Sequence, residues 1–289
     1  MANKYSKIIA GVMSWANWGK QLSKKEVITL VNNCLKNGIT TFDHADIYGG
    51  YTTEADFGNA FLESGIEREK IQLISKCGIQ YVCDQRNNEV KHYNYSKEYI
   101  IWSVDRSLKN LKSDYLDLLL LHRPSPLMRA DEIAEAITQL KQQGKIKDFG
   151  ISNFTTSQVA LISQHVDVSV NQIEFSLTQL EAMHNGLLDN MKINGITAMA
   201  WSPLGSVFKE DTEQTRRIHN QLGVLMEKYN ATEDQLLLAW IMKHPINIHP
   251  VIGTTNKKRL ADAVTATKIN LDLEDWFLIL VASQGHKVP

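Results

Sequence analysis

The sequence predicts an α/β fold, a (β/α)8 TIM barrel, from the order of its apolar segments. Short runs of aliphatic and β-branched residues alternate with longer amphipathic stretches along the chain, at roughly 30 residues per pair. Residues 118–121 are apolar on both faces, as a strand between helices and a barrel interior requires. No G-x-G-x-x-G follows any run, which argues against an open, doubly wound sheet.

The first two strands and the helix between them carry the clearest local signals. Residues 8–12 form a short apolar run that predicts a strand. Ser23 and Glu26 form a capping box that begins a helix over 23–36, and Gly38 ends it before a strand over 39–42. The same rhythm predicts helices over 53–62, 96–111, 131–142, 156–164, 186–193, 213–229 and 233–242, and strands over 71–75, 116–121, 146–151, 169–173, 196–200 and 248–252.

Two segments do not fit the repeated strand and helix pattern. Residues 77–95 are the longest irregular polar stretch, and we expect a loop at the barrel mouth. Residues 273–284 are amphipathic and should pack outside the barrel as a C-terminal helical tail. Because no linker, low-complexity stretch or charge block divides the chain, residues 1–289 are predicted to form a single domain.

The composition is that of an ordinary globular protein. Of the 289 residues 43% are hydrophobic and 22% charged, and the net charge of −1 gives no general reason to bind nucleic acid or an anionic membrane. Three scattered cysteines are too few for a disulfide framework or a zinc site, so we expect no metal. Residues 1–7 lead into only a short apolar stretch, which predicts a cytoplasmic protein without a signal peptide or membrane span.

Polar side chains suited to acid–base chemistry follow three successive predicted strands. In a (β/α)8 barrel the active site forms at the carboxyl ends of the strands. Asp43 and Tyr48 follow the second strand, Lys76 the third and His122 the fourth. Each alone could be a turn cap or a structural residue, but four at one mouth favour a site. Lys76 at a strand end would be partly desolvated, which is costly unless Asp43 pairs with it.

Six segments resemble the motifs of the aldo-keto reductase family. Residues 42–49 (FDHADIYG) resemble the signature around the catalytic Asp and Tyr, and residues 114–124 (DYLDLLLLHRP) the segment that ends in the active-site His. Similar matches lie at 144–154 (GKIKDFGISNF), 171–175 (NQIEF), 201–205 (WSPLG) and 251–255 (VIGTT). They cover nearly the whole chain in the family's order, and the details resemble a bacterial branch of uncharacterised oxidoreductases.

The resemblance implies a carbonyl reductase with a tetrad of Asp43, Tyr48, Lys76 and His122. Tyr48 would protonate the carbonyl oxygen, although an unperturbed tyrosine with a pKa of about 10 is a poor donor at neutral pH. A Lys76 cation held by Asp43 would lower that pKa. His122 would hydrogen-bond the substrate oxygen and orient it toward the hydride donor, a nicotinamide.

The resemblance also implies where that cofactor binds. Ser152, Asn153 and Gln172 match the positions that bind the carboxamide, and Trp201 matches the aromatic residue that stacks on the nicotinamide ring. Positions expected near the phosphates are Ser202, Leu204, Gly205, Gly253, Thr254, Thr255, Asn256, Lys257 and Arg259. The cations after residue 255, which include Lys258, predict NADP(H), with NAD(H) possible. Gly253 stands where the best-studied members have a lysine.

The substrate would be a small carbonyl compound bound by Trp15, Tyr48 and His122. Its identity depends on mouth loops, here 15–22, 77–95 and 205–212, where Trp15, Trp18, Tyr51 and Tyr81 suggest an aromatic-walled pocket.

Two other functions remain open on the sequence. The chain could be a non-catalytic, nucleotide-binding regulatory barrel, as some ion-channel subunits of the family are. It could also be a metal-dependent barrel hydrolase that uses His44, Asp46 and His122, although a second histidine pair at ligand spacing is missing. A nucleic-acid binder has no basic, aromatic patch to support it.

Overall fold

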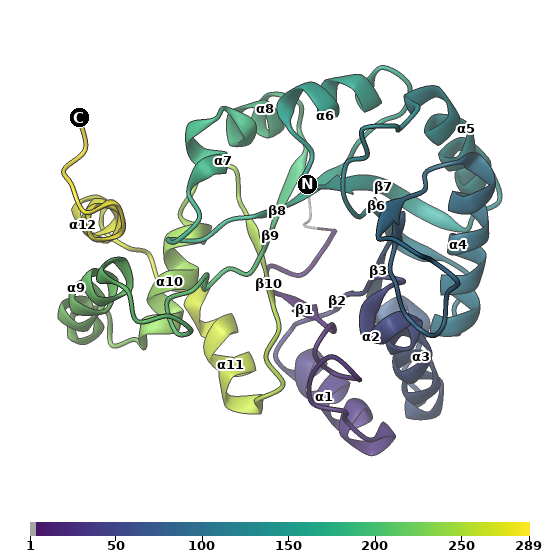
Figure 1. Cartoon of the computed structure of the whole chain (residues 1–289). Coiled ribbons are helices and arrows are strands. Elements are labelled where there is room, and N and C mark those ends of the chain that lie inside the picture. The colour runs from purple at the N-terminus through teal and green to yellow at the C-terminus, as the bar shows by residue number, and fades with distance from the viewer. Residues whose placement is uncertain (1–3) are drawn as a thin grey trace.

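The computed structural model, which describes residues 4–289, contains a closed barrel of eight parallel strands (Figure 1). Around the barrel the strand order is β1-β10-β9-β8-β7-β6-β3-β2. The strands are β1 (Ile9–Gly11), β2 (Thr41–Asp43), β3 (Gln72–Cys77), β6 (Leu116–Leu121), β7 (Ile146–Ser152), β8 (Val170–Glu174), β9 (Thr197–Trp201) and β10 (His249–Ile252). The predicted barrel fold is therefore confirmed. Residues 1–3, the start of the segment inspected for a signal peptide, lie outside the described residues.

Helices surround the strands as a ring (Figure 1). Those that alternate with the strands are α1 (Lys24–Lys36), α3 (Thr53–Ser64), α4 (Lys97–Leu111), α5 (Ala130–Gln142), α6 (Thr156–Ser163), α8 (Leu187–Ile193), α9 (Glu213–Tyr229), α10 (Glu233–Met242) and α11 (Lys257–Ala266). Shorter helical turns lie at α2 (Tyr48–Tyr51), Arg68–Lys70 and α7 (Glu181–His184). The predicted capping box of Ser23 and Glu26 is present at the start of α1.

The strands differ from the prediction mainly at their ends. β2 runs to Asp43, β3 to Cys77 and β9 to Trp201, so several polar residues expected just after strands are the last or next-to-last residues within them. Ladder hydrogen bonds continue through these positions because the neighbouring strands extend equally far. Lys76, for example, pairs in register with Leu120 of β6. Their backbones are fixed by the sheet rather than by a loop.

The segment expected to be a mouth loop has some regular structure. β4 (Ile79–Gln80) and β5 (His92–Tyr93) form a short antiparallel pair, in register at Ile79 and Tyr93. Beside them Tyr51 donates a hydrogen bond to the Ile79 carbonyl, and its hydroxyl accepts one from the Tyr81 amide. These bonds tie the segment to the turn that follows β2.

Two apolar layers fill the molecule, one inside the barrel and one between strands and helices. The lumen cluster consists of buried side chains from six of the strands and the N-terminal segment, namely Tyr5, Ile9, Ile74, Leu118, Leu120, Val170, Met199 and Val251. The Tyr5 hydroxyl donates to Asp148 Oδ2 at 2.7 Å near the amino ends of the strands. Side chains therefore fill the lumen, which places any open site at the opposite end.

The C-terminal helix α12 (Leu273–Gln284) packs outside the barrel against α9, as expected (Figure 1). Trp276 of α12 stacks on Trp240 of α10 with ring centroids 4.8 Å apart. Each indole N–H donates to the other residue's backbone carbonyl, at 3.0 and 3.1 Å. This reciprocal pair fixes the tail on the helical layer.

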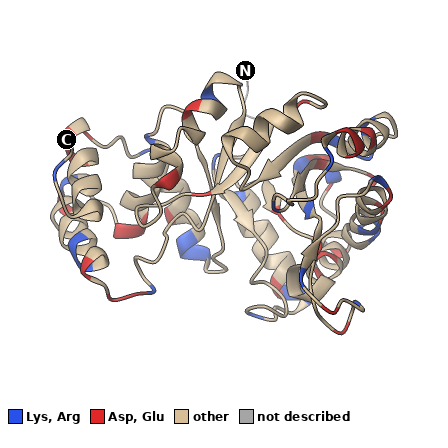
Figure 2. Cartoon of the chain, turned by 45° about the horizontal axis from the view of Figure 1, so that its top comes forward, with Lys and Arg blue, Asp and Glu red and all other residues tan. Residues whose placement is uncertain are grey.

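Charged residues of both signs are interspersed over the outer helices (Figure 2). Many form exposed ion pairs, such as Lys24 with Glu63 and Arg216 with Asp211, which contribute little to stability. Among residues 4–289, the structure has no helix that is long and apolar enough to span a membrane.

Candidate active site

Lys76 lies at the centre of a buried polar cluster at the carboxyl end of the barrel. Its side chain is 1% exposed, and its ammonium donates three hydrogen bonds. The acceptors are Asp43 Oδ2 at 2.7 Å, the His44 carbonyl at 2.9 Å and the Tyr48 hydroxyl at 3.2 Å. All three N–H groups are thus satisfied, which makes a buried ammonium tolerable.

The environment of Lys76 favours its charged form. Burial alone would lower the pKa of the ammonium, but the carboxylate of Asp43 and the oxygen of Tyr48 raise it above its ordinary value. The lysine is therefore a permanent cation in contact with the tyrosine oxygen.

Asp43 is held by both of its carboxylate oxygens. Oδ2 binds Lys76, while Oδ1 accepts a hydrogen bond of 2.9 Å from Gln172 Nε2. Asp43 lies on β2 and Gln172 on β8, which are not neighbours in the barrel, so this bond crosses the lumen. This bond holds the Asp43 carboxylate in place, and the carboxylate in turn positions the Lys76 ammonium.

Tyr48 begins a tight turn whose next two positions favour glycine. Gly49 and Gly50 have φ of +63° and +69°, and a Cβ on Gly49 would lie 2.5 Å from Thr53 Oγ1. This tight turn aims the phenol back at Lys76. Burial raises the pKa of the phenol, and Lys76 opposes that rise. We expected the lysine to bring the pKa below its usual value, but in this structure the net direction is upward.

His122 follows the last residue of β6, as predicted. Its ring is 6.0 Å from the Tyr48 ring, centroid to centroid, at an interplanar angle of 77°. Burial, followed by the positive charge of Lys76, lowers the pKa of His122 well below its ordinary value, so the ring is neutral at pH 7. Nδ1 is buried without a partner among residues 4–289, whereas Nε2 is not enclosed in this way.

The residues expected to bind a carboxamide form one hydrogen-bonded chain. Trp201 Nε1 donates to Asn153 Oδ1 at 2.9 Å, Asn153 Nδ2 donates to Ser152 Oγ at 2.7 Å, and Ser152 Oγ donates to the Gln172 carbonyl at 2.9 Å. Gln172 Nε2 then reaches Asp43, and Gln172 Oε1 makes no hydrogen bond within the described chain. These side chains are thus brought together and oriented, with one amide oxygen left to accept.

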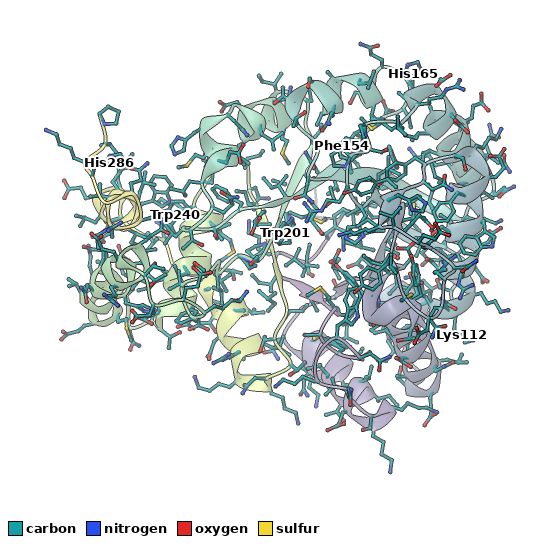
Figure 3. The ribbon with its side chains drawn as sticks, viewed as in Figure 1. Lys112, Phe154, His165, Trp201, Trp240 and His286 are labelled. Atoms are coloured by element: carbon teal, nitrogen blue, oxygen red, sulfur yellow. The ribbon has the colours of Figure 1, made fainter. Side chains whose placement is uncertain are left out.

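Trp201, labelled in Figure 3, lies near the middle of the ring of elements and is partly exposed. The guanidinium carbon of Arg123 is 5.3 Å from the centroid of its ring. Arg123 directly follows His122, so the rule that located His122 also pointed to it. No role for Arg123 was predicted from the sequence.

The segments expected near a nucleotide's phosphates lie at the same end of the barrel, after β9 and β10. Gly205 has φ of +54°, and its place is closed to larger residues because a Cβ would lie 2.1 Å from Thr178 Oγ1. Ser202 and Leu204 are partly buried beside it. The six expected positions from Gly253 to Arg259 are partly or fully exposed.

At the start of α11, the Asn256 side chain accepts hydrogen bonds from the amides of Lys258 and Arg259. The Lys258 ammonium pairs with Asp262 at 2.9 Å. Within residues 4–289, Lys257 and Arg259 form no ion pair, so these two cations are available to an anion.

Of the two tryptophans expected at the mouth, only Trp18 is open to solvent. Trp15, predicted to bind the substrate, is 2% exposed and packs in the core against Phe42 and Phe57, at centroid distances of 6.2 and 6.1 Å. Trp18 is 38% exposed and its ring lies 6.2 Å from Tyr48 and 5.3 Å from Tyr81. Trp18 is therefore the expected aromatic residue that lies nearer to Tyr48 at the open mouth.

The structure does not gather the residues suggested for a metal-dependent hydrolase. No group of three or more His, Cys, Asp or Glu side chains in the part of the chain described, 4–289, could hold a metal ion. His44 is fully buried against Phe57, with ring centroids 4.4 Å apart, and burial lowers its pKa to about 3.

Comparison with known proteins decides the family. The model of the aldo/keto reductase family matches residues 7–280. The chain belongs to the aldo/keto reductase family. As a member it is an oxidoreductase that acts in carbonyl reduction.

Three comparisons define its place in that family. It is 41% identical to YcsN, an uncharacterised oxidoreductase of Bacillus subtilis, over 99% of this chain and 97% of that one. It is 35% identical to a 6-dehydroglucose reductase of Agrobacterium fabrum, over 92% of this chain and 90% of the relative. Among solved structures, the thermostable aldo-keto reductase Tm1743 in complex with epalrestat superposes with a TM-score of 0.80 at 25% identity, covering 96% and 94% of the two chains.

Proposed function

We propose that this aldo/keto reductase reduces an aldehyde or ketone to an alcohol with NADPH, and that Tyr48 is the general acid. The observation that carries the proposal is the Lys76 ammonium, which contacts both the Tyr48 hydroxyl at 3.2 Å and Asp43 at 2.7 Å inside the barrel. A cation in contact with the phenol oxygen stabilises the phenolate that remains after proton transfer.

Each residue of the cluster has one task in this reaction. Neutral His122 donates a hydrogen bond from Nε2 to the carbonyl oxygen and holds it near the Tyr48 hydroxyl. Tyr48 transfers its proton to that oxygen as negative charge develops there, and Lys76 stabilises the resulting phenolate. Asp43 keeps Lys76 charged and in place. The nicotinamide supplies the hydride when bound.

The residues present fit a nicotinamide nucleotide. Gln172 Oε1 is a free acceptor for a carboxamide N–H, and Asn153 and Ser152 lie in the same chain of hydrogen bonds. Trp201 offers a partly exposed aromatic face beside them. Lys257 and Arg259 would hold an adenosine 2′-phosphate at the start of α11.

A turnover assay tests the reductase against the non-catalytic alternative. Purified protein with NADPH and a reactive aldehyde should consume NADPH and form the corresponding alcohol in equal amounts. A protein that binds NADPH but forms no alcohol from any of a panel of aldehydes would instead be a nucleotide-binding regulatory barrel.

The preference for NADPH should depend on Arg259. One charge-assisted hydrogen bond contributes about 1.5–3 kcal/mol, so Arg259→Ala should raise the Kd of NADPH roughly 10–150-fold. NADH lacks the phosphate, and its Kd should barely change. Quenching of tryptophan fluorescence measures both constants. Equal Kd values for the two cofactors in the unmodified protein would contradict the preference.

Gly253 offers the reciprocal variant. A Cβ there meets nothing within 4 Å, so a side chain can be added without strain. Gly253→Lys should tighten NADPH binding and leave NADH unchanged, because it adds a cation where the best-studied members of the family have one. Tighter binding of both cofactors would mean that position 253 does not face the 2′-phosphate.

A further inference from the structure

The guanidinium of Arg123 has no partner although it is partly buried. Its backbone N–H and C=O both contact the Tyr95 hydroxyl, but its side chain makes no hydrogen bond and no ion pair with any residue of 4–289. A guanidinium carries five N–H donors and cannot lose its charge in a protein. Arg68, by contrast, bonds Asp117 and two backbone carbonyls.

The free guanidinium lies at the reaction site itself. Arg123 follows His122 at the end of β6, and its guanidinium carbon is 5.3 Å from the Trp201 ring centroid. Its positive charge lowers the pKa of both Tyr48 and His122. For Tyr48 this opposes the effect of burial, and for His122 it adds to it. A molecule with its carbonyl between these two residues would therefore have Arg123 beside it.

A second unpaired cation acts on the same site. Lys91, exposed in the 77–95 segment, also acts on His122, and none of the carboxylates in the described chain pairs with it. The cluster's own carboxylate, Asp43, is fully engaged by Lys76 and Gln172. An incoming carboxylate would thus meet two unpaired cations, and a planar guanidinium binds carboxylate oxygens two at a time.

We infer that Arg123 determines substrate specificity by binding a carboxylate on the carbonyl substrate, so that the preferred substrates are aldehydes or ketones that bear an acid group. This inference rests on the proposed reductase function. Neutral carbonyl compounds leave the partly buried guanidinium without a partner in the complex, which costs binding free energy that the acid substrate recovers.

Matched acids and esters test the inference. The measured quantity is kcat/KM with NADPH for 3- and 4-carboxybenzaldehyde relative to their methyl esters, which keep the shape and remove the charge. The ratio of acid to ester should exceed about 10 in the unmodified protein and should fall roughly 10–100-fold in Arg123→Gln, chiefly through KM. Arg123→Lys, which keeps the charge but loses the fork, should fall between the two.

Lys268→Gln is the matched control, since it removes one exposed, unpaired cation near the amino ends of the strands. It should leave the acid-to-ester ratio unchanged. A ratio near one in the unmodified protein, or a ratio that Arg123→Gln does not alter, would overturn the inference. A rise in the Kd of NADPH that accounts for the whole loss would also overturn it, since the guanidinium would then serve the cofactor. Turnover of the esters shows that the reductase itself is working in each of these cases.

Discussion

Tyr48→Phe should slow carbonyl reduction by about 10²–10⁴-fold, the range usual for a positioned general acid. The change removes one hydroxyl and keeps the ring that contacts Trp18 and His122. The Lys76 ammonium keeps its bonds to Asp43 and to the His44 carbonyl, so the buried cluster remains largely satisfied. Single-turnover rates at saturating NADPH and aldehyde measure the effect.

NADPH binding is the control for Tyr48→Phe. Tryptophan quenching should give nearly the same Kd as in the unmodified protein, because the proposed cofactor contacts lie on Ser152, Gln172 and Trp201. If the variant keeps more than half of the original rate at saturating substrate, another group donates the proton.

Lys76→Met should be nearly as damaging and should also move the pH profile. Burial raises the pKa of Tyr48, and Lys76 is the strongest influence that lowers it, so removing the cation raises that pKa further. Reduction needs the protonated phenol, and its alkaline decline should therefore shift to higher pH while the plateau falls. An alkaline decline that stays in place would show that Lys76 does not act on the proton donor.

Asp43→Asn should also lower the rate, but more weakly, because the lysine remains. The carboxylate itself raises the pKa of Tyr48, so the alkaline decline should not move to higher pH as it does in Lys76→Met. Without the carboxylate the buried ammonium loses the main influence that raises its pKa. Removing one partner of a buried ion pair costs about 3–5 kcal/mol of stability. The double variant should lose less than the sum of the single losses, in both rate and free energy of unfolding. Additive losses would mean that the two residues support the rim independently.

The barrel could be predicted because its signals are local and repeated. Capping residues, glycines after helices and strand segments that are apolar on both faces, such as 118–121, each depend on nearby sequence, and all eight strands were identified. Strand ends were less certain, since ladder bonds to neighbouring strands decide where a strand stops. Lys76 was placed after a strand, whereas pairing with β6 keeps it inside one.

The residues of the site and the contacts of Lys76 with Asp43 and Tyr48 could be predicted, but the longer-range contacts could not. The rule of strand ends located Asp43, Lys76 and His122, but the bond between Asp43 and Gln172 joins residues 129 positions apart and could not be read from spacing. Trp15 and Trp18 lie three residues apart in one loop, and the path of that loop determines which of the two side chains is buried in the core. The lack of a hydrogen-bond or ion-pair partner for the Arg123 guanidinium depends on where all other side chains lie, so the sequence could not show it.

The hydrogen bond from Gln172 to Asp43 spans the barrel, and it makes the site sensitive to changes in the barrel's cross-section. A change that widens the ring of strands would stretch this 2.9 Å bond, because it joins strands on opposite sides of the barrel. Enlarging a lumen side chain just below, for example Val170→Phe, would therefore detune the proton donor in a protein that is still folded. On warming, activity in such an enzyme would fade ahead of the loss of secondary structure. Loss of the bond from Gln172 to Asp43 would then end activity under milder conditions than those that unfold the protein.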